Sequence, residues 1–321
     1  MALVLAGDVG GTKTRLAVYD DHLGPVAHSV YISKHYRTFE AVLRDFVKKN
    51  AGPFRSACFG VAGPVISGTV RTTNLDWTID GRKLARTLRC PVALLNDVEA
   101  AAHGLSHTLP KDVQVLSKAH PAHHPATKAL VAPGTGLGEA IIHWNNGHYD
   151  TLATEGGHAD FAPRTALQWE LKKFLAATAG DTSVEALLSG RGMHRIYDFL
   201  KHAQFAEQND AVREAIRKHG SPAITEAALH KADPLSIGTL DLFVDIIAAE
   251  AQRVALTAKA LGGVYLTGGI VPHLLPALKN PRFMRIFLDN RMKRLLERIP
   301  VVVVMNEDLA LYGALVYARR L

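Results

Sequence analysis

Short apolar runs separated by turn residues fill the first third of the chain. Residues 2–6, 14–19 and 26–32 are apolar or alternate between apolar and polar, and Gly, Asp or Pro separates them. Such runs predict the strands of a meander. Two further apolar runs, at 56–61 and 92–95, are bounded by turn residues, as strands buried inside a sheet are.

Helical spacing of the apolar residues appears between these strands and dominates the second half of the chain. It predicts helices at 39–49, 80–88 and 98–105. Almost all of 165–261 has the same pattern, broken by Gly and Pro, and 309–319 predicts a last helix with an apolar face. The mixture of strands and helices therefore predicts an α/β fold.

A second set of strands follows a polar stretch. Residues 107–127 are rich in His and Pro, and we interpret them as a connection between two lobes, with His120, His123 and His124 solvated and not bound to metal. Strands are predicted beyond it at 129–132, 139–144, 148–152, 264–267 and 301–305. A length of 321 residues suits two such lobes.

The composition is that of a globular protein, with 48% hydrophobic and 21% charged residues. We expect no signal peptide, because the apolar start is short and has no basic lead. No run approaches the ~18 apolar residues of a membrane span, so we expect a cytoplasmic protein without a membrane partner. Cys58 and Cys90 form no paired zinc motif and are interpreted as reduced core thiols.

The formal net charge of +7 would suit an anionic partner. The Lys and Arg residues are dispersed, however. Their densest stretch, 282–298, mixes them with Asp289 and Glu297 at helical spacing, as on a solvated helix face. We therefore expect an anionic substrate such as a nucleotide, and no nucleic-acid partner.

Two glycine-rich turns occur in matching positions, each between two predicted strands. The first, at 7–12, reads GDVGGT, and the second, at 133–138, reads PGTGLG. Glycine lets backbone N–H groups converge on an anion with no side chain in the way. The first turn is neither a Walker A loop nor a Rossmann loop, because Thr12 stands where a P-loop has glycine and a strand follows instead of a helix.

We therefore predict hairpin tips that hold phosphate through the backbone, with the Thr12 hydroxyl as a further donor and Asp8 facing a metal ion. Two ordinary tight hairpins are the alternative. A third glycine pair, Gly268-Gly269, follows the predicted strand at 264–267 and precedes a predicted helix near 271–278. Such a turn can accept the flat face of a base or a ribose.

Polar side chains stand at the ends of several of these elements. Asn96 and Asp97 end one predicted strand, and ligands bind at the carboxyl ends of strands in open α/β sheets. Asp97 could instead only cap the next helix, whereas capping explains Asn96 less well. Glu155 and His158, joined by two glycines, can face one small polar ligand, although a surface ion pair is the alternative. Glu185 by itself indicates only a helix surface.

Taken together, these segments resemble the bacterial-type glucokinases of the hexokinase–actin ATPase superfamily, in the branch without a zinc-binding cysteine motif. The resemblance runs across almost the whole chain in the family's order. It is carried by residues 7–12, 60–64, 96–97, 133–138, 155–163, 188–190 and 267–272. The stretch 155–163 is the most specific of them, because the glycine turns are shared by the whole superfamily.

The resemblance implies a two-lobed actin-like ATPase (ribonuclease H-like) α/β fold, in which each lobe is a mixed sheet flanked by helices and a cleft separates them. A small lobe of residues 1–108 plus 306–321 and a large lobe of residues 109–305 are expected. The implied activity is ATP-dependent phosphorylation of D-glucose at the 6-hydroxyl, the entry to glycolysis. The implied partners are glucose, ATP with Mg²⁺, and a second copy in a homodimer.

The same resemblance implies roles for individual residues. Asp97 is expected to be the catalytic base. The expected sugar ligands are Asn96, Asp97, Glu155, His158, Glu185 and Gly63. The expected nucleotide-binding residues are Gly7, Asp8, Gly10, Gly11, Thr12, Gly134, Thr135, Gly136, Gly138, Gly268 and Gly269. Asp8 is also expected to bind Mg²⁺, directly or through water. Lys13 departs from the small polar residue often found after that Thr, and the segment 60–64 is close to the family pattern but not identical.

Other activities are compatible with parts of this pattern. Fructose or mannose could replace glucose, and polyphosphate could replace ATP. A sugar-responsive regulator on the same fold would need an N-terminal DNA-binding module, and we expect none because the first glycine turn begins at Gly7. A filament-forming ATPase of the actin type is disfavoured by the Glu155–His158 group.

Overall fold

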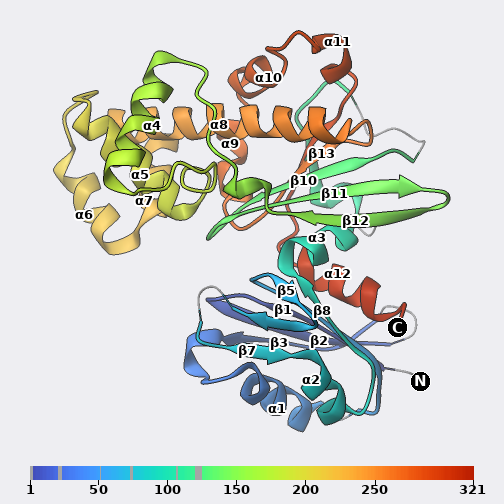
Figure 1. The fold of residues 1–321 in the computed structure, drawn as a ribbon. Coiled ribbons are helices and arrows are strands. Elements are labelled where there is room, and N and C mark those ends of the chain that lie inside the picture. The colour runs from blue at the N-terminus through green and yellow to red at the C-terminus, as the bar shows by residue number, and fades with distance from the viewer. Residues whose placement is uncertain (1–2, 21–23, 51, 73–74, 106–107, 120–124) are drawn as a thin grey trace. The chain divides into compact units, whose positions relative to one another are not determined.

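The computed structural model describes residues 3–20, 24–50, 52–72, 75–105, 108–119 and 125–321. The chain forms two units, each built around its own sheet (Figure 1). Unit 1 contains Met1–Pro110, Thr151–Ala153 and Asn306–Leu321, and unit 2 contains Lys111–Asp150 and Thr154–Met305.

Unit 1 has a five-stranded sheet in the order β3-β2-β1-β4-β8. Its strands are β1 (Leu3–Val9), β2 (Lys13–Tyr19), β3 (Pro25–Ile32), β4 (Phe54–Val61) and β8 (Val92–Asn96). Strand β1 pairs antiparallel with β2 and parallel with β4, which in turn pairs parallel with β8. The strand segments predicted from apolar runs are confirmed, with ends that move by at most three residues.

Helices cover both faces of this sheet (Figure 1). They are α1 (Phe39–Lys49), α2 (Gly81–Leu88), α3 (Asp97–Gly104) and α12 (Leu309–Ala318). On one face Phe39 and Phe46 of α1 are fully buried with Phe59 of β4. On the other face Leu311 and Leu315 of α12 pack among the small residues of β1 and β2. Full burial of each such side chain contributes roughly 1.5–3 kcal/mol, so both faces hold the sheet in place.

Unit 2 repeats the same strand pattern in a six-stranded sheet of order β12-β11-β10-β13-β14-β9. Its strands are β9 (Val113–Val115), β10 (Lys128–Pro133), β11 (Leu137–Asn145), β12 (His148–Thr154), β13 (Val264–Leu266) and β14 (Val301–Val304). Strand β10 pairs antiparallel with β11 and parallel with β13, as β1 does with β2 and β4. Each glycine-rich turn therefore connects the two strands of an antiparallel hairpin, and the two hairpins occupy equivalent places in the two sheets.

The helices of unit 2 pack around one long helix, α8. They are α4 (Ala166–Thr178), α5 (Gly190–His202), α6 (Asp210–His219), α7 (Ser221–Leu229), α8 (Pro234–Ala258), α9 (Leu275–Leu278), α10 (Pro281–Phe287) and α11 (Lys293–Leu296). Helix α8 contacts α5, α7, α10 and strand β10. None of the helices in the described part of the chain is long and apolar enough to cross a membrane.

Several features differ from the sequence expectations. The stretch 107–127 is more than a connection, because β9 lies within it and pairs with β14. Its histidines His120, His123 and His124 lie outside the described residues. The basic stretch 282–298 holds two short helices, α10 and α11, and not one helix face. A small sheet of β5 (Val65–Ile66), β6 (Thr69–Arg71) and β7 (Thr78–Asp80) was not expected.

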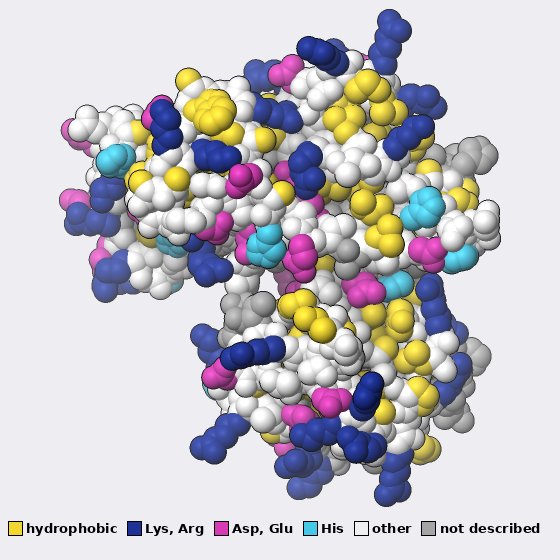
Figure 2. Space-filling view, in the orientation of Figure 1, with side chains coloured by type: hydrophobic (Ala, Val, Ile, Leu, Met, Phe, Trp, Pro, Cys, Tyr) yellow, Lys and Arg dark blue, Asp and Glu magenta, His cyan; other side chains and the backbone are white. Residues whose placement is uncertain are grey.

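Two expectations from composition hold in the described residues. Cys58 and Cys90 are both buried and free, as expected for core thiols. On the face that Figure 2 shows, Lys and Arg side chains are spread over each unit and interspersed with acidic ones.

Candidate active site

The first glycine turn connects β1 to β2 in unit 1, and hydrogen bonds fix its carbonyl groups. The Gly10 N–H donates to the Lys13 carbonyl over 3.0 Å. Ser33 binds the turn twice, since its N–H donates to the Thr12 carbonyl over 3.0 Å and its hydroxyl to the Gly10 carbonyl over 2.7 Å. Among the described residues, these bonds do not use the N–H groups of Gly11 and Thr12. Those two amides can therefore donate to an anion.

Gly7 has a different position from the rest of this motif. It lies within β1 and is buried, and a Cβ added there would lie 2.6 Å from Phe59 and 2.8 Å from Leu16. A glycine is required at position 7 because the side chains of Phe59 and Leu16 leave no space for a Cβ. The expectation that it binds nucleotide directly therefore has no support in its position.

Asp8 and Arg15 form an ion pair across the β1–β2 hairpin, where they stand opposite each other in the register. Arg15 Nη1 lies 3.1 Å from Asp8 Oδ2. The same guanidinium reaches Glu307 at 3.2 Å and Asp308 at 3.4 Å, just before α12. Burial raises the pKa of Asp8, and Arg15 opposes that rise. Arg15 therefore holds the carboxylate that was expected to bind Mg²⁺, and the sequence analysis did not single it out.

Asn96 and Asp97 lie where β8 ends and α3 begins. Asn96 is the N-cap of α3: its Oδ1 accepts from the Val98 N–H at 2.8 Å, and its Nδ2 donates to the Gly63 carbonyl at 3.2 Å. The suggestion that Asp97 is the capping residue is therefore wrong. Asp97 is the first residue of the helix, where the helix dipole favours a negative charge. Its Oδ1 accepts from the Val98 N–H at 2.9 Å, and its side chain is partly exposed.

Glycines bring the segment 60–64 close to this helix start. A Cβ at Gly60 would lie 2.8 Å from the Ala100 Cβ. Glycine at position 60 therefore lets β4 approach α3 more closely than a residue with a side chain would. Gly63 has φ of +145° and would place a Cβ 2.9 Å from the Arg71 carbonyl. Its own carbonyl receives the Asn96 amide. Gly63 thus contacts Asn96 through its carbonyl group.

The second glycine turn connects β10 to β11 in unit 2. The Gly134 N–H donates to the Gly136 carbonyl at 2.7 Å, and the Gly134 carbonyl accepts from the Gly190 N–H at 3.0 Å, at the start of α5. The Leu137 N–H donates to Glu185 Oε2 at 2.8 Å. A Cβ at Gly136 would lie 2.5 Å from that oxygen, so glycine is needed there. Thr135 is exposed at the tip and Gly138 lies in β11.

Glu185 was interpreted as a helix-surface residue, and this is wrong. It lies in a turn before α5, partly buried. Its N–H donates to the Gly157 carbonyl at 2.9 Å while its carboxylate binds the Leu137 N–H. Glu185 therefore joins the second glycine turn to the segment that holds Glu155 and His158. Sequence spacing gives no signal for this, because 48 residues separate Glu185 from Leu137.

Glu155 precedes a short 3-10 turn, Gly156–His158, after the end of β12, and His158 is the last residue of that turn. His158 Nε2 lies 3.6 Å from Glu155 Oε2, and the two side chains are 61% and 72% exposed. Exposed pairs of this kind contribute little to stability. Because both side chains are exposed, their polar groups are accessible to a ligand that carries hydroxyl groups.

The third glycine pair lies beside the second glycine turn. Gly268 has φ of +93°, and a Cβ there would lie 2.5 Å from the Pro133 carbonyl. The Thr267 N–H donates to the Val131 carbonyl at 3.0 Å, which aligns the end of β13 with β10. Gly269 is exposed and no atom would obstruct a Cβ there. Unit 2 thus brings all its sequence-predicted residues together at one end of its sheet.

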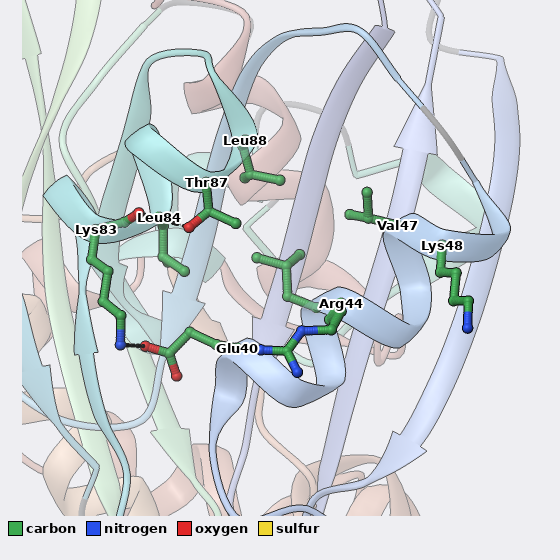
Figure 3. Close-up of a pocket in the computed structure, with 9 residues that line it drawn as sticks. Glu40, Arg44, Val47, Lys48, Lys83, Leu84, Thr87 and Leu88 are labelled. Carbon is green, nitrogen blue, oxygen red and sulfur yellow. Dashed lines mark hydrogen bonds and ion pairs between the residues drawn. The ribbon is translucent and has the colours of Figure 1, made fainter.

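A separate pocket of about 380 Å³ lies between α1 and α2 (Figure 3). It is lined by Glu40, Leu43, Arg44, Val47, Lys48, Lys83, Leu84, Thr87 and Leu88. Among these lining residues, Lys83 Nζ lies 3.1 Å from Glu40 Oε1. None of the sequence-predicted site residues lines this pocket, so it is not part of the candidate site. In the part of the chain that the structure describes, no group of three or more His, Cys, Asp or Glu side chains is placed to hold a metal ion.

Comparison with known proteins identifies the family and the fold of the chain. The family model described as "Glucokinase" matches residues 5–321. A glucokinase of Nostoc punctiforme is 36% identical over 100% of both chains. The solved glucokinase of Balamuthia mandrillaris, in complex with glucose, has a TM-score of 0.85 at 21% identity and covers 99% of this chain and 94% of its own. A ROK family glucokinase of Streptomyces griseus, solved with glucose and AMPPNP, has a TM-score of 0.70 at 22% identity over 99% and 100%.

Proposed function

The chain belongs to the glucokinase family and phosphorylates glucose with ATP, and we propose that Asp97 is the general base of this reaction. The family and the actin-like fold expected from the motifs are thereby confirmed. The observation that carries the base assignment is that Asn96 and Asp97 have different positions at the start of α3, as N-cap and as first helical residue. Asn96 caps the helix, so capping does not require the Asp97 carboxylate.

In the proposed step, an Asp97 carboxylate oxygen accepts the proton of the sugar 6-hydroxyl. The hydroxyl oxygen then forms a bond to the γ-phosphorus of ATP as the bond to the bridging β–γ oxygen breaks. ADP leaves with that electron pair, and the sugar leaves as its 6-phosphate. Phosphoryl transfer has a loose transition state, so catalysis depends mainly on positioning and charge stabilisation.

Backbone amides and glycines supply that positioning for ATP. In unit 1 the N–H groups of Gly11 and Thr12 are oriented by the bonds from Ser33 to the turn. In unit 2 the turn with Gly134 and Gly136 is fixed by Glu185 and the start of α5. We propose that both turns bind phosphate, and that Gly268-Gly269 binds the adenosine.

Asp8 is the residue that we propose to hold Mg²⁺, directly or through a water molecule. Mg²⁺ usually takes one or two protein carboxylates and completes its shell with phosphate oxygens and water. A single carboxylate beside a phosphate-binding turn suits this chemistry, and Arg15 fixes its orientation. When bound, Mg²⁺ neutralises charge on the phosphates.

We propose Glu155, His158, Glu185, Asn96 and Gly63 as the sugar-binding group. Glu155→Gln is expected to raise the glucose KM by about 10-fold or more, because a hydrogen bond to a charged group contributes roughly 1.5–3 kcal/mol. The ATP KM should change little. Steady-state kinetics with each substrate varied in turn measures both values.

Glu170→Gln provides a matched control, since Glu170 also forms an exposed ion pair at spacing i, i+3 in unit 2, with Lys173 at 2.9 Å. Its kinetics should equal those of the native protein. An unchanged glucose KM in Glu155→Gln would remove Glu155 from the sugar site.

A coupled assay of glucose 6-phosphate formation tests the activity as a whole. ATP with glucose should give product at the highest kcat/KM. Fructose and mannose test the strictness for the sugar, and polyphosphate tests the donor. If fructose or mannose gave a higher kcat/KM than glucose, that hexose and not glucose would be the preferred substrate.

We also propose a cytoplasmic homodimer with a small lobe of residues 1–108 and 306–321 and a large lobe of residues 109–305. The use of ATP as substrate supports the location, and the two compact units support the division into lobes. Sedimentation velocity measures the oligomeric state.

A further inference from the structure

The loop that holds Glu155 and His158 rests on strand β11. A Cβ at Gly156 would lie 2.2 Å from Glu139 Oε2 and 3.2 Å from Arg253 Nη2. A Cβ at Gly157 would lie 2.5 Å from the Leu137 carbonyl. The two glycines therefore let the loop backbone lie directly on the Glu139 carboxyl group and on the strand beside it.

Glu139 is part of a buried charged cluster. Its side chain is 4% exposed, and Oε2 accepts a hydrogen bond from Arg253 Nη2 at 2.6 Å. Arg253 also donates from Nε to Glu250 Oε1 at 2.6 Å, and Glu250 is 6% exposed. Glu139 Oε1 is buried without a hydrogen-bond partner in the described part of the chain. Two carboxyl groups thus share one guanidinium below the loop.

A second link runs through the backbone. The Thr154 hydroxyl donates to the Glu139 carbonyl at 3.2 Å and accepts from the Gly156 N–H at 3.3 Å. Glu139 is therefore connected to Gly156 both through its side chain and through its carbonyl. A buried ionic cluster is weak evidence for stability, because apolar residues of the same volume often stabilise as much. Its value here lies in the geometry that it imposes.

We propose that Glu139, held by Arg253, is a positioning residue that fixes the position of the Gly156 backbone and so directs Glu155 and His158 at the sugar. This inference rests on the proposed function, since it assumes that the loop binds sugar. Glu139 does not touch the sugar, and its effect passes through the loop backbone.

The same geometry makes the position of the loop depend on pH. Burial and the neighbouring Glu250 raise the pKa of Glu139 to about 8, while Arg253 opposes the rise. Arg253 and Glu250, both on α8, are the charged groups that act on it, and Arg164 interacts with Glu250 in turn. As pH rises through this range, Glu139 loses its proton and its repulsion with Glu250 grows. The glucose KM should therefore rise on the alkaline side.

The test compares Glu139→Ala, Glu139→Gln, Gly156→Ala and the Glu139→Ala/Gly156→Ala double variant. Glu139→Ala should raise the glucose KM by about 10-fold, since a misplacement of about 1 Å can cost as much as 10²-fold, with the ATP KM unchanged. Glu139→Gln should restore most of the affinity and should lose the alkaline rise. As a single variant, Gly156→Ala should raise the glucose KM. In the Glu139→Ala background it should cause no further rise, because space exists there for the new methyl group.

Asp245→Asn is the matched control. Asp245 also lies on α8 and pairs with Arg282 at 2.7 Å, but it is bound to α10 and not to the loop. Its variant should lose stability in a thermal melt and keep the native glucose KM. Equal glucose KM values in Glu139→Ala, Gly156→Ala and Asp245→Asn would overturn the inference while leaving the activity intact. A native protein that neither binds nor phosphorylates glucose would overturn the proposed function and this inference with it.

Discussion

Replacing Asp97 with Asn is expected to lower turnover by about 10²–10⁴-fold, the range for loss of a general base, while glucose binding stays measurable. The amide has nearly the same shape as the carboxylate and still offers an oxygen to the Val98 N–H, which Asp97 Oδ1 accepts at 2.9 Å. It cannot accept the hydroxyl proton, however. Steady-state kinetics gives the fall in kcat, and calorimetric titration with glucose gives the remaining affinity.

Glu99→Gln is the control for this prediction. Glu99 lies in the same first turn of α3, so its variant removes a negative charge from the same helix terminus. Turnover in Glu99→Gln should remain near that of the native protein. An equal loss in both variants would mean that charge at the helix start matters and that Asp97 does not act as the base.

The sequence allowed the two sheets to be predicted because their strands are short apolar runs between turn residues. The two glycine-rich turns were also predicted as hairpin tips, since a predicted strand precedes and follows each of them. Capping was offered as the alternative role of Asp97, and not of Asn96, because both residue types cap helices well and only the backbone geometry distinguishes them. A cap and a candidate base that are adjacent in sequence cannot be separated by composition.

Other parts of the site depend on long-range packing, which periodicity does not reveal. Glu139 lies in an apolar strand and Arg253 on a helix 114 residues later, and only the fold brings them together. The strand β9 has three residues, too few for alternation to be detected. Arg15 is a different case, because both of its hairpin's strands were predicted and only the register, which the structure supplies, places it opposite Asp8.

Arg15→Met is expected to destabilise the fold by about 3 kcal/mol at neutral pH, near the lower end of the range for breaking a buried ion pair. Arg15 is the cation shared by Asp8, Glu307 and Asp308, and its side chain is only 20% exposed. Without it, the buried Asp8 carboxylate faces two further carboxylates. Glu307 and Asp308 are more exposed, so water screens part of their repulsion. Urea unfolding followed by circular dichroism measures the loss.

The pH dependence of this loss identifies its cause. Burial already raises the pKa of Asp8, so the stability that its protonated form contributes is present at acid pH and is lost as pH rises through the folded pKa. Arg15 limits that rise, and its removal raises the pKa of Asp8 further. The native and Arg15→Met proteins should therefore converge in stability as pH falls toward about 4, the usual value for Asp. A loss that is independent of pH would point to missing side-chain packing instead of charge.

Arg282→Met is the control for this prediction, because it breaks the ion pairs with Asp241 and Asp245 in unit 2. It should also destabilise the fold but leave the ATP KM unchanged, whereas Arg15→Met should raise the ATP KM.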